Sequence, residues 1–270
     1  MSQQVVLITG ASTGIGKAIG DYLHHKNFIV YGTSRNPEKY TSDFLFKLLS
    51  LDVADKDSIN KAVTTIIKQQ GKLDILINNA GAGITGPMEE IPTSKILQNF
   101  TTNYLGPIEV TKAVLPQMRK QRNGFIIHIT SIAGYMGLPY RGVYSASKAA
   151  LEITSEAWRM ELKEFNIKMT TIAPGAFATN IAAGRYHAPV LENSPYKKTY
   201  GRTLELINQD VDGGKDPVEI AKEIEKIITK DNPKVHYQIG AFLQKFSITL
   251  KKILPDTVYE KMLRKHFDLD

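Results

Sequence analysis

The segment that decides the fold stands close to the start of the chain. It reads Val5-Val6-Leu7-Ile8-Thr9-Gly10-Ala11-Ser12-Thr13-Gly14-Ile15-Gly16. Its first four residues are apolar, as expected for a strand buried on both faces of a parallel sheet. Three glycines follow, and residues 15–25 then have helical spacing. A glycine-rich turn between a strand and a helix lets the backbone approach a phosphate group, which the helix N-terminus binds. Glycines also mark ordinary tight turns, but this position favours a dinucleotide site.

Strand and helix patterns alternate along the rest of the chain. Apolar runs predict strands at 28–32, 48–53, 73–77, 125–130 and 168–172, and helical segments are expected at 58–70, within 93–121 and at 144–165. This alternation indicates an α/β fold, a Rossmann-like doubly wound parallel sheet with helices on both faces.

The domain organisation is expected to be simple, with a single domain over residues 1–270. Residues 175–215 are rich in Gly, Pro, Asn and Tyr with weak periodicity, and we expect them to form a substrate cap. In an open sheet, such an excursion lies over the carboxyl ends of the strands, where ligands bind. Residues 240–270 are expected to form a C-terminal helical extension.

The composition narrows the class of protein. The 270 residues include no cysteine, which excludes a disulfide scaffold, thiolate metal sites and a cysteine nucleophile. The six histidines are dispersed without a metal-binding spacing, so we predict no catalytic metal. Residues 1–8 do not resemble a secretory signal, and no apolar run approaches the roughly 18 residues of a membrane span. We therefore expect a soluble, cytoplasmic protein.

The net charge of +7 suits a nucleic acid, a membrane surface or an anionic small molecule as partner. The lysines are scattered, without a block of five or interleaved aromatic residues, so we predict no nucleic-acid partner. Residues 241–266 hold six basic and two acidic residues, with apolar residues at helical spacing. This pattern is typical of a helix that docks on the protein body or on a partner subunit. The alternative is a peripheral contact with an anionic membrane.

The residues after the second predicted strand indicate which dinucleotide binds. An NAD site usually carries an Asp or Glu there, about 20 residues after the glycines, which binds the ribose 2′-hydroxyl. Residues 32–37 contain no carboxylate, and Arg35 has the planar donors that pair with a 2′-phosphate. Ser12 is a second donor for that phosphate. Taken alone, Arg35 is typical of a surface loop, but together with the missing acid it predicts NADP(H), with NAD(H) the weaker alternative.

Tyr144 and Lys148 stand four residues apart in a predicted helix and therefore share one face. A tyrosine has an ordinary pKa of about 10, and a neighbouring ammonium group lowers that pKa towards the range of general acid–base catalysis. Ser131, at the end of a predicted strand, could hold a substrate oxygen, and Asn103 could bind a water that relays protons to Lys148. Each also has a plainer interpretation: a solvated helix face for the pair, a strand-end cap for Ser131 and a helix-distorting polar residue for Asn103.

Taken together, these motifs resemble the short-chain dehydrogenase/reductase family over roughly residues 4–180. The motifs are Thr9-Gly10-x-x-x-Gly14-x-Gly16, Asn78-Asn79-Ala80-Gly81, Ser131, Tyr144-x-x-x-Lys148 and Pro174-Gly175. The resemblance implies a seven-stranded parallel sheet, NAD(P)-dependent hydride transfer between a carbonyl and an alcohol, and a homodimer or homotetramer.

The resemblance also assigns roles to residues. Tyr144 is implied to be the general acid/base, Lys148 to lower its pKa and bind the nicotinamide ribose, and Ser131 to orient the substrate oxygen. Asn103 completes the implied proton relay. In the implied cofactor site, Asp52 meets the adenine amino group, Asn79 lies beside the adenine ribose and Thr179 holds the carboxamide. The cofactor-binding residues implied in full are Gly10, Ser12, Gly14, Ile15, Gly16, Arg35, Asp52, Val53, Asn79, Tyr144, Lys148, Phe177 and Thr179.

The substrate is indicated by residues 134–140, which stand between Ser131 and Tyr144 and are apolar and aromatic. Residues 131–151 and the tail at 237–266 resemble the branch of estradiol 17β-dehydrogenase and the retinol dehydrogenases. This resemblance implies a lipophilic small-molecule alcohol or ketone as substrate.

The alternatives remain open at this point. Residues 134–140 could equally form a packed loop, and the protein could be a non-catalytic dinucleotide sensor. A smaller carbonyl compound or an anionic acyl thioester is the other substrate class, which Arg185, Lys197 and Lys198 would suit. The cap is expected to supply the opposite wall of the pocket, with Ile181, Tyr186, His187, Tyr196 and Tyr200.

Overall fold

A single parallel sheet organises the chain. The computed structural model describes residues 3–40, 44–177, 184–212 and 214–269. Seven strands lie in the order β3 (Lys47–Ser50), β2 (Ile29–Ser34), β1 (Val5–Ile8), β4 (Ile75–Asn78), β6 (Gly124–Ile129), β7 (Ile167–Pro174) and β9 (His236–Ile239). Every neighbouring pair is parallel, which confirms the predicted Rossmann-like sheet and places the seventh, implied strand at β9.

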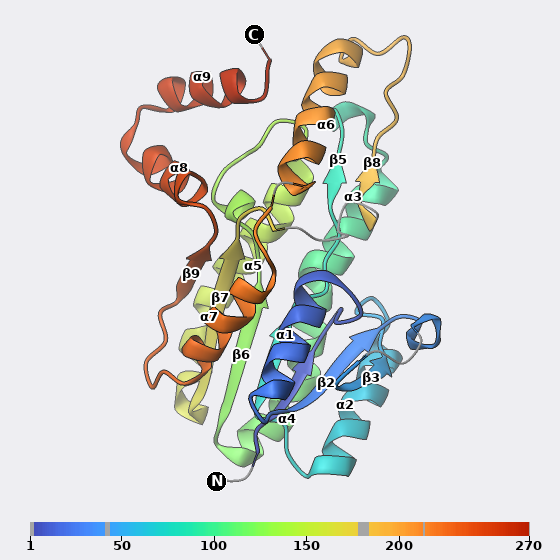
Figure 1. Cartoon of the computed structure of the whole chain (residues 1–270), viewed down its shortest axis with the longest axis vertical. Coiled ribbons are helices and arrows are strands. Elements are labelled where there is room, and N and C mark those ends of the chain that lie inside the picture. Colours follow the sequence, from blue (N-terminus) through green and yellow to red (C-terminus); the bar gives the residue numbers. More distant parts are fainter. Residues whose placement is uncertain (1–2, 41–43, 178–183, 213, 270) are drawn as a thin grey trace.

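Helices cover both faces of this sheet (Figure 1). The helices α1 (Gly14–His25) and α7 (Val218–Ile228) cover one face, and α2 (Lys56–Gln70), α4 (Gly106–Gln121) and α5 (Gly142–Glu161) cover the other. Alternate residues of β1 enter the two cores, because successive side chains of a strand point to opposite faces. Val5 and Leu7 pack under α2 and α4, while Val6 and Ile8 pack under α1 and α7.

The predicted elements are present, with two boundaries shifted for local reasons. β3 ends at Ser50 rather than at residue 53, because the carboxylate of Asp52 accepts a hydrogen bond from Ala54 N at 2.9 Å and starts a turn. α5 ends at Glu161 rather than near 165, since a 3-10 turn at Lys163–Phe165 and Asn166, with φ of 57°, follow it. Other 3-10 turns lie at Pro37–Lys39, Met88–Glu90 and Ile132–Tyr135.

The segment between β4 and β6 contains two α-helices separated by a distortion. α3 (Thr93–Phe100) continues into a π-helical turn at Thr101–Leu105, and α4 follows. Such π turns insert one extra residue into a helix and are frequent at functional sites. Asn103, predicted to lie in a helix, is in this turn and is fully buried.

Residues 184–212, which we call the cap, lie beyond the carboxyl ends of the strands (Figure 1), and their role in covering a substrate stays a prediction. β5 (Ile84–Thr85) and β8 (Tyr186–His187) form a small parallel sheet there, and α6 (Lys197–Asp212) stands beside it.

Two further helices, α8 (Phe242–Ile253) and α9 (Asp256–His266), follow β9, separated at Leu254 and Pro255. Ile248 and Tyr259 are buried against Met136, so both helices contact the body, while Phe242, Leu243 and Ile253 stay exposed. Within the described residues, no helix combines the length and apolar character needed to cross a bilayer.

Candidate active site

The glycine-rich turn after β1 has a backbone that only glycine suits. Gly10 and Gly14 have φ of 64° and 56°, in the left-handed region that side chains disfavour. A Cβ on Gly10 would lie 2.9 Å from Ala80 Cα, and one on Gly16 would lie 2.4 Å from Gly10 O. The turn is therefore packed against the end of β4 and leaves its own backbone as the surface towards a ligand.

The start of α1 fits the pyrophosphate of a dinucleotide. Thr13 precedes the helix, its side chain caps none of the first N–H groups, and the first turn holds no acidic residue. Uncapped N–H groups and the positive end of the helix dipole are what an anion needs. Ser12 and Ile15 are partly exposed at the same turn, where the cofactor prediction places them.

Asn79 braces this turn from the end of β4. Its amide donates to Thr9 O at 3.0 Å and to Gly10 O at 2.9 Å, and the Thr9 hydroxyl accepts from the backbone N–H groups of Asn79 and Ala80. Both amide hydrogens of Asn79 are thus used within the protein. Its predicted place beside the adenine ribose stays a prediction.

The residues predicted to select the dinucleotide lie at the ends of β2 and β3, which pair in register at Ser34 and Ser50. Arg35 is exposed, and within the described ranges no ion pair or hydrogen bond engages its guanidinium. Asp52 is half-buried, and Val53 is buried under α4 against Gly106. Arg35, Asp52 and Val53 therefore lie at the same edge of the sheet as the glycine-rich turn after β1.

Tyr144 and Lys148 lie in the first two turns of α5, on one face of the helix, as the spacing predicted. Lys148 is 4% exposed, and its Nζ donates to Ile129 O at 3.0 Å, next to the end of β6. Ser131 lies two residues after the end of β6 and interacts with the phenol of Tyr144. The structure thereby brings together a phenol, an ammonium group and a hydroxyl from two elements.

The electrostatics of the site favour ionisation of Tyr144. Burial raises the pKa of its phenol, but the positive charges of Lys148 and Arg141 and the contact with Ser131 outweigh burial, so the pKa lies below its ordinary 10.0. Burial lowers the pKa of Lys148, which the negative charges of Tyr144 and Glu152 partly offset. A phenol with a lowered pKa exchanges protons more readily near neutral pH.

Asn103 anchors the loop that lies beside Lys148. Its Oδ1 accepts from Ala82 N at 2.8 Å, and its Nδ2 donates to Ala82 O at 2.9 Å and to Ser147 Oγ at 3.1 Å. Asn99, one turn earlier, donates to the same Ala82 O at 2.9 Å. The amide thus joins the loop after β4 to α5, and its water-relay role stays a prediction.

Behind Lys148 lies an ionic chain that the sequence analysis missed. Glu152, one turn further along α5, is 4% exposed and contacts His236 Nδ1 at 2.7 Å, while His236 Nε2 lies 2.9 Å from Glu156. The hydrogen bond to Glu152 raises the pKa of His236 above its ordinary 6.5. The four-residue spacing from Lys148 to Glu152 was a visible signal, but the position of His236 on β9 was not.

The loop at 134–140 divides between two clusters. Met136, with Tyr135 and Leu138, packs against Ile248 and Tyr259 of the C-terminal helices. Tyr140 instead packs with Tyr144 beneath the cap. Most of this loop is therefore a packed support, and Tyr140 is the residue that reaches the neighbourhood of Tyr144.

The described part of the cap packs an apolar cluster against Tyr144. Tyr200 of α6 is 1% exposed, and its hydroxyl donates to Ala188 O at 2.9 Å, with Thr85 O at 3.3 Å. The cluster around it contains Ile84, Ile91, Val143 and Ala188, with Phe100, Tyr140, Tyr144, Tyr186, Tyr196 and Leu204 packed against it. Phe177 is buried in the core beneath α7, whereas Thr179 and Ile181 lie outside the described residues.

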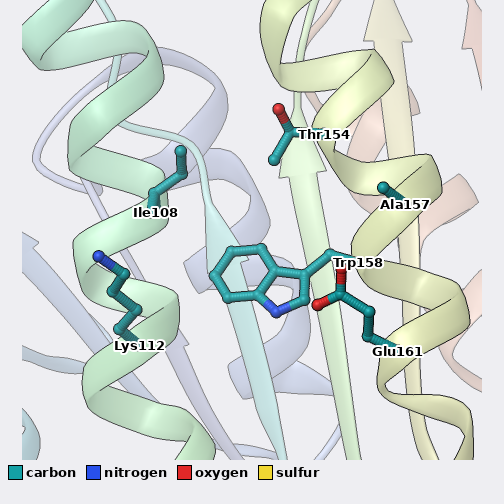
Figure 2. Close-up of a pocket in the computed structure, with 6 residues that line it drawn as sticks. All are labelled: Ile108, Lys112, Thr154, Ala157, Trp158 and Glu161. Carbon is teal, nitrogen blue, oxygen red and sulfur yellow. The ribbon is translucent and has the colours of Figure 1, made fainter.

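A groove of about 210 Å³ lies elsewhere, between α4 and α5 (Figure 2). It is lined by Ile108, Lys112, Thr154, Ala157, Trp158 and Glu161. Tyr144, Lys148 and Leu151 repeat on another face of α5, because residues three or four apart share a face. The groove is therefore separate from the site around Tyr144.

Known proteins are similar to this chain over most of its length. Residues 4–189 match the family described as short chain dehydrogenase. The 3-ketodihydrosphingosine reductase of Bacteroides thetaiotaomicron is 39% identical over 265 residues, with 98% of each chain covered. Retinol dehydrogenase 8 of Bos taurus is 31% identical over 254 residues, which cover 85% of this chain and 79% of the bovine protein.

A solved structure is similar over the whole fold. A short-chain dehydrogenase from Streptomyces avermitilis superposes with a TM-score of 0.83 at 31% identity, covering 98% of this chain and 99% of that one. The similarity thus extends past the glycine-rich half, through the cap and the C-terminal helices.

Proposed function

The chain belongs to the short-chain dehydrogenase/reductase family, and from that premise we propose that it is an NADP(H)-dependent oxidoreductase acting on a lipophilic small molecule. It interconverts a carbonyl group with a primary or secondary alcohol on a steroid-, retinoid- or lipid-like compound. Tyr144, Lys148, Ser131 and Asn103 carry the proton chemistry.

The observation that carries the proposal is the arrangement of Tyr144 against Lys148 and Ser131. When bound, the nicotinamide supplies or accepts the hydride. The Tyr144 hydroxyl donates a proton to the substrate oxygen in reduction and accepts one in oxidation. Lys148 stabilises the phenolate, and Ser131 holds the substrate oxygen beside it. Asn103 keeps the neighbouring loop in place through Ala82.

The apolar surroundings of Tyr144 support a lipophilic substrate. The rings of Tyr140 and Tyr200 lie tilted to each other with their centroids 5.1 Å apart, and Tyr140 and Tyr144 both pack against the apolar cluster that contains Tyr200. Aromatic and aliphatic walls with few polar groups are typical of sites for apolar ligands. The relatives named for 3-ketodihydrosphingosine and for retinol point to the same class.

Arg35 supports NADP(H) over NAD(H). It stands at the end of β2, and Ser34 and Asn36 on either side carry no charge that would bind or repel a phosphate. A planar guanidinium forms paired hydrogen bonds with phosphate oxygens, whereas a ribose 2′-hydroxyl is best held by a carboxylate.

The test is a substrate panel followed at 340 nm with NADPH and, in parallel, NADH. The panel holds long-chain ketones, steroid ketones, retinal and short aliphatic ketones, with each alcohol tested in the reverse direction. We expect turnover of an apolar class with NADPH and much weaker turnover with NADH. Binding of NADPH without turnover of any carbonyl compound would contradict the enzymatic proposal and favour a dinucleotide sensor.

A further inference from the structure

A buried cation, Arg185, lies beside the candidate acid/base and forms no salt bridge with any carboxylate of the described residues. Arg185 stands just before β8, is 9% exposed, and its Nη1 is fully buried. Among the residues that the structure describes, this nitrogen has no hydrogen-bond partner. A buried guanidinium normally has an acceptor, because desolvating a charge without pairing it is costly.

The backbone makes room for this side chain. Gly83, in the loop after β4, lies against Arg185, and a Cβ there would come within 2.8 Å of both Arg185 Cγ and Nε. The preceding residue of that loop is Ala82, which Asn99 and Asn103 hold. The loop beside Lys148 thus also positions Arg185, so that both cations share one support.

The groups beside Arg185 do not neutralise it while Tyr144 carries its proton. Burial and the positive charge of Arg141 lower the pKa of the Arg185 guanidinium, whereas the ionised form of Tyr144 raises that pKa. Arg141 itself lies 5.2 Å from the ring of Tyr144. His187, the nearest basic group on β8, also has a pKa lowered by burial and by Arg185. The lowered pKa keeps His187 neutral, so the positive charge here belongs to Arg141 and Arg185, which both lie beside Tyr144.

We propose that Arg185 binds an oxyanion carried by the substrate, a carboxylate or a phosphate ester close to the carbonyl that Tyr144 protonates. This inference rests on the proposed function and narrows its substrate class to an amphiphile with an apolar chain and an anionic group near the reacting carbon. The guanidinium fork offers parallel donors to two oxygens of such a group. Tyr140, which is partly exposed and packs with Tyr144, would contact the chain.

The experiment compares charged and neutral forms of one substrate. The probes are 2-oxo-, 3-oxo- and 4-oxodecanoate, each against its methyl ester, with kcat and KM measured for wild type and for Arg185→Gln and Arg185→Lys. We expect wild type to prefer one acid over its ester by roughly 10- to 100-fold in kcat/KM, the range of a charge-assisted hydrogen bond. Arg185→Gln should abolish that preference by raising the KM of the acid, and Arg185→Lys should restore part of it.

The matched control is Arg202→Gln. Arg202 is an arginine of α6 whose charge is already paired with Asp268 at 3.0 Å. This variant should keep the preference for the acid. Equal use of acid and ester by wild type, or an equal loss on both in Arg185→Gln, would overturn the inference while leaving the proposed function standing.

A binding measurement separates the inference from catalysis and distinguishes the two oxyanions. Calorimetry with the NADPH-bound protein compares decanoate, decyl phosphate and decanol, none of which carries a ketone or aldehyde that NADPH could reduce. We expect one of the two anions to bind, with binding lost in Arg185→Gln and kept in Arg202→Gln. If every carbonyl compound fails to turn over, the proposed function is wrong, and this binding result alone decides the anion site. Equal binding of decanol and both anions would refute it.

Discussion

The glycine-rich turn after β1 and the cap around Tyr200 face the same site but are built in opposite ways. The turn presents backbone: Gly10 and Gly14 adopt left-handed conformations, and α1 offers uncapped N–H groups. The cap presents side chains. Tyr200 and Arg185 are two of them, and both stand more than 100 residues after Gly81 in the sequence. Backbone donors suit any dinucleotide, whereas side chains can select one substrate. In the proposed function, the turn is therefore the general half of the site, and the cap is the specific half.

The largest expected effect comes from the residue between these halves. Tyr144→Phe removes the proton donor while keeping the ring that packs under the cap. We expect kcat to fall by about 10³-fold, the order that general acid–base catalysis contributes. The Kd of NADPH, measured by fluorescence, should stay near the wild-type value. A variant that kept wild-type kcat would remove Tyr144 from the mechanism.

A single methyl group added to Gly10 should destabilise the glycine-rich turn. Gly10→Ala places a Cβ in a left-handed residue and 2.9 Å from Ala80 Cα, so we expect a loss of about 3 kcal/mol in the free energy of unfolding. Gly71→Ala is the matched control, because Gly71 has φ of 70° but nothing within 4 Å of its Cβ position. It should cost only about 1 kcal/mol. Equal losses in urea unfolding would show that the contact with Ala80 is unimportant.

Arg35→Asp tests whether the general half also selects the dinucleotide. The substitution replaces a partner for the 2′-phosphate with a partner for the 2′-hydroxyl. We expect the NADP/NAD ratio of kcat/KM to fall by about 100-fold, within the range of a lost charged hydrogen bond and an added repulsion. The substrate KM should hardly change. An unchanged ratio would show that the exposed guanidinium of Arg35 does not meet the cofactor.

Tyr200→Phe tests whether the cap contributes to substrate binding and leaves cofactor binding unaffected. It deletes the hydroxyl that donates to Ala188 O and should lower the free energy of unfolding by about 1 kcal/mol, because one buried acceptor loses its donor. The substrate KM should rise while the Kd of NADPH stays constant. If the Kd of NADPH changed instead, the division of labour between turn and cap would be wrong.

The smallest effect concerns pH. Oxidation needs the phenolate of Tyr144, so its kcat/KM should rise with pH through an apparent pKa below 10.0, and reduction should fall through the same pKa. Arg141→Gln removes a positive charge that lowers this pKa, and should move both profiles upward by less than about one pH unit. Arg202→Gln should leave both profiles in place. A downward shift in Arg141→Gln would contradict the assigned sign.

Short-range patterns explain why much of this molecule could be predicted. The run from Val5 to Ile8, the glycines after it and the spacing of Tyr144 and Lys148 each reflect a local rule of strand, turn or helix. These local rules failed where the conformation of a segment depends on contacts with residues far away in the sequence. The π turn at Asn103 is one such place, because its geometry follows from contacts with Ala82 and Ser147. The division of the loop at 134–140 between two clusters is another.

By itself, the sequence determined the parallel sheet, its glycine-rich turn and the shared face of Tyr144 and Lys148, because these depend on residues within a few positions of one another. Only the tertiary structure decided which side chains surround that pair. It brought Ser131 to the phenol, His236 to Glu152 behind Lys148, and Arg185 against Gly83. The last two contacts join residues more than 80 positions apart in the sequence. These side chains are therefore buried or half-buried, and their charges act on one another, only when the sheet has placed the ends of its strands side by side.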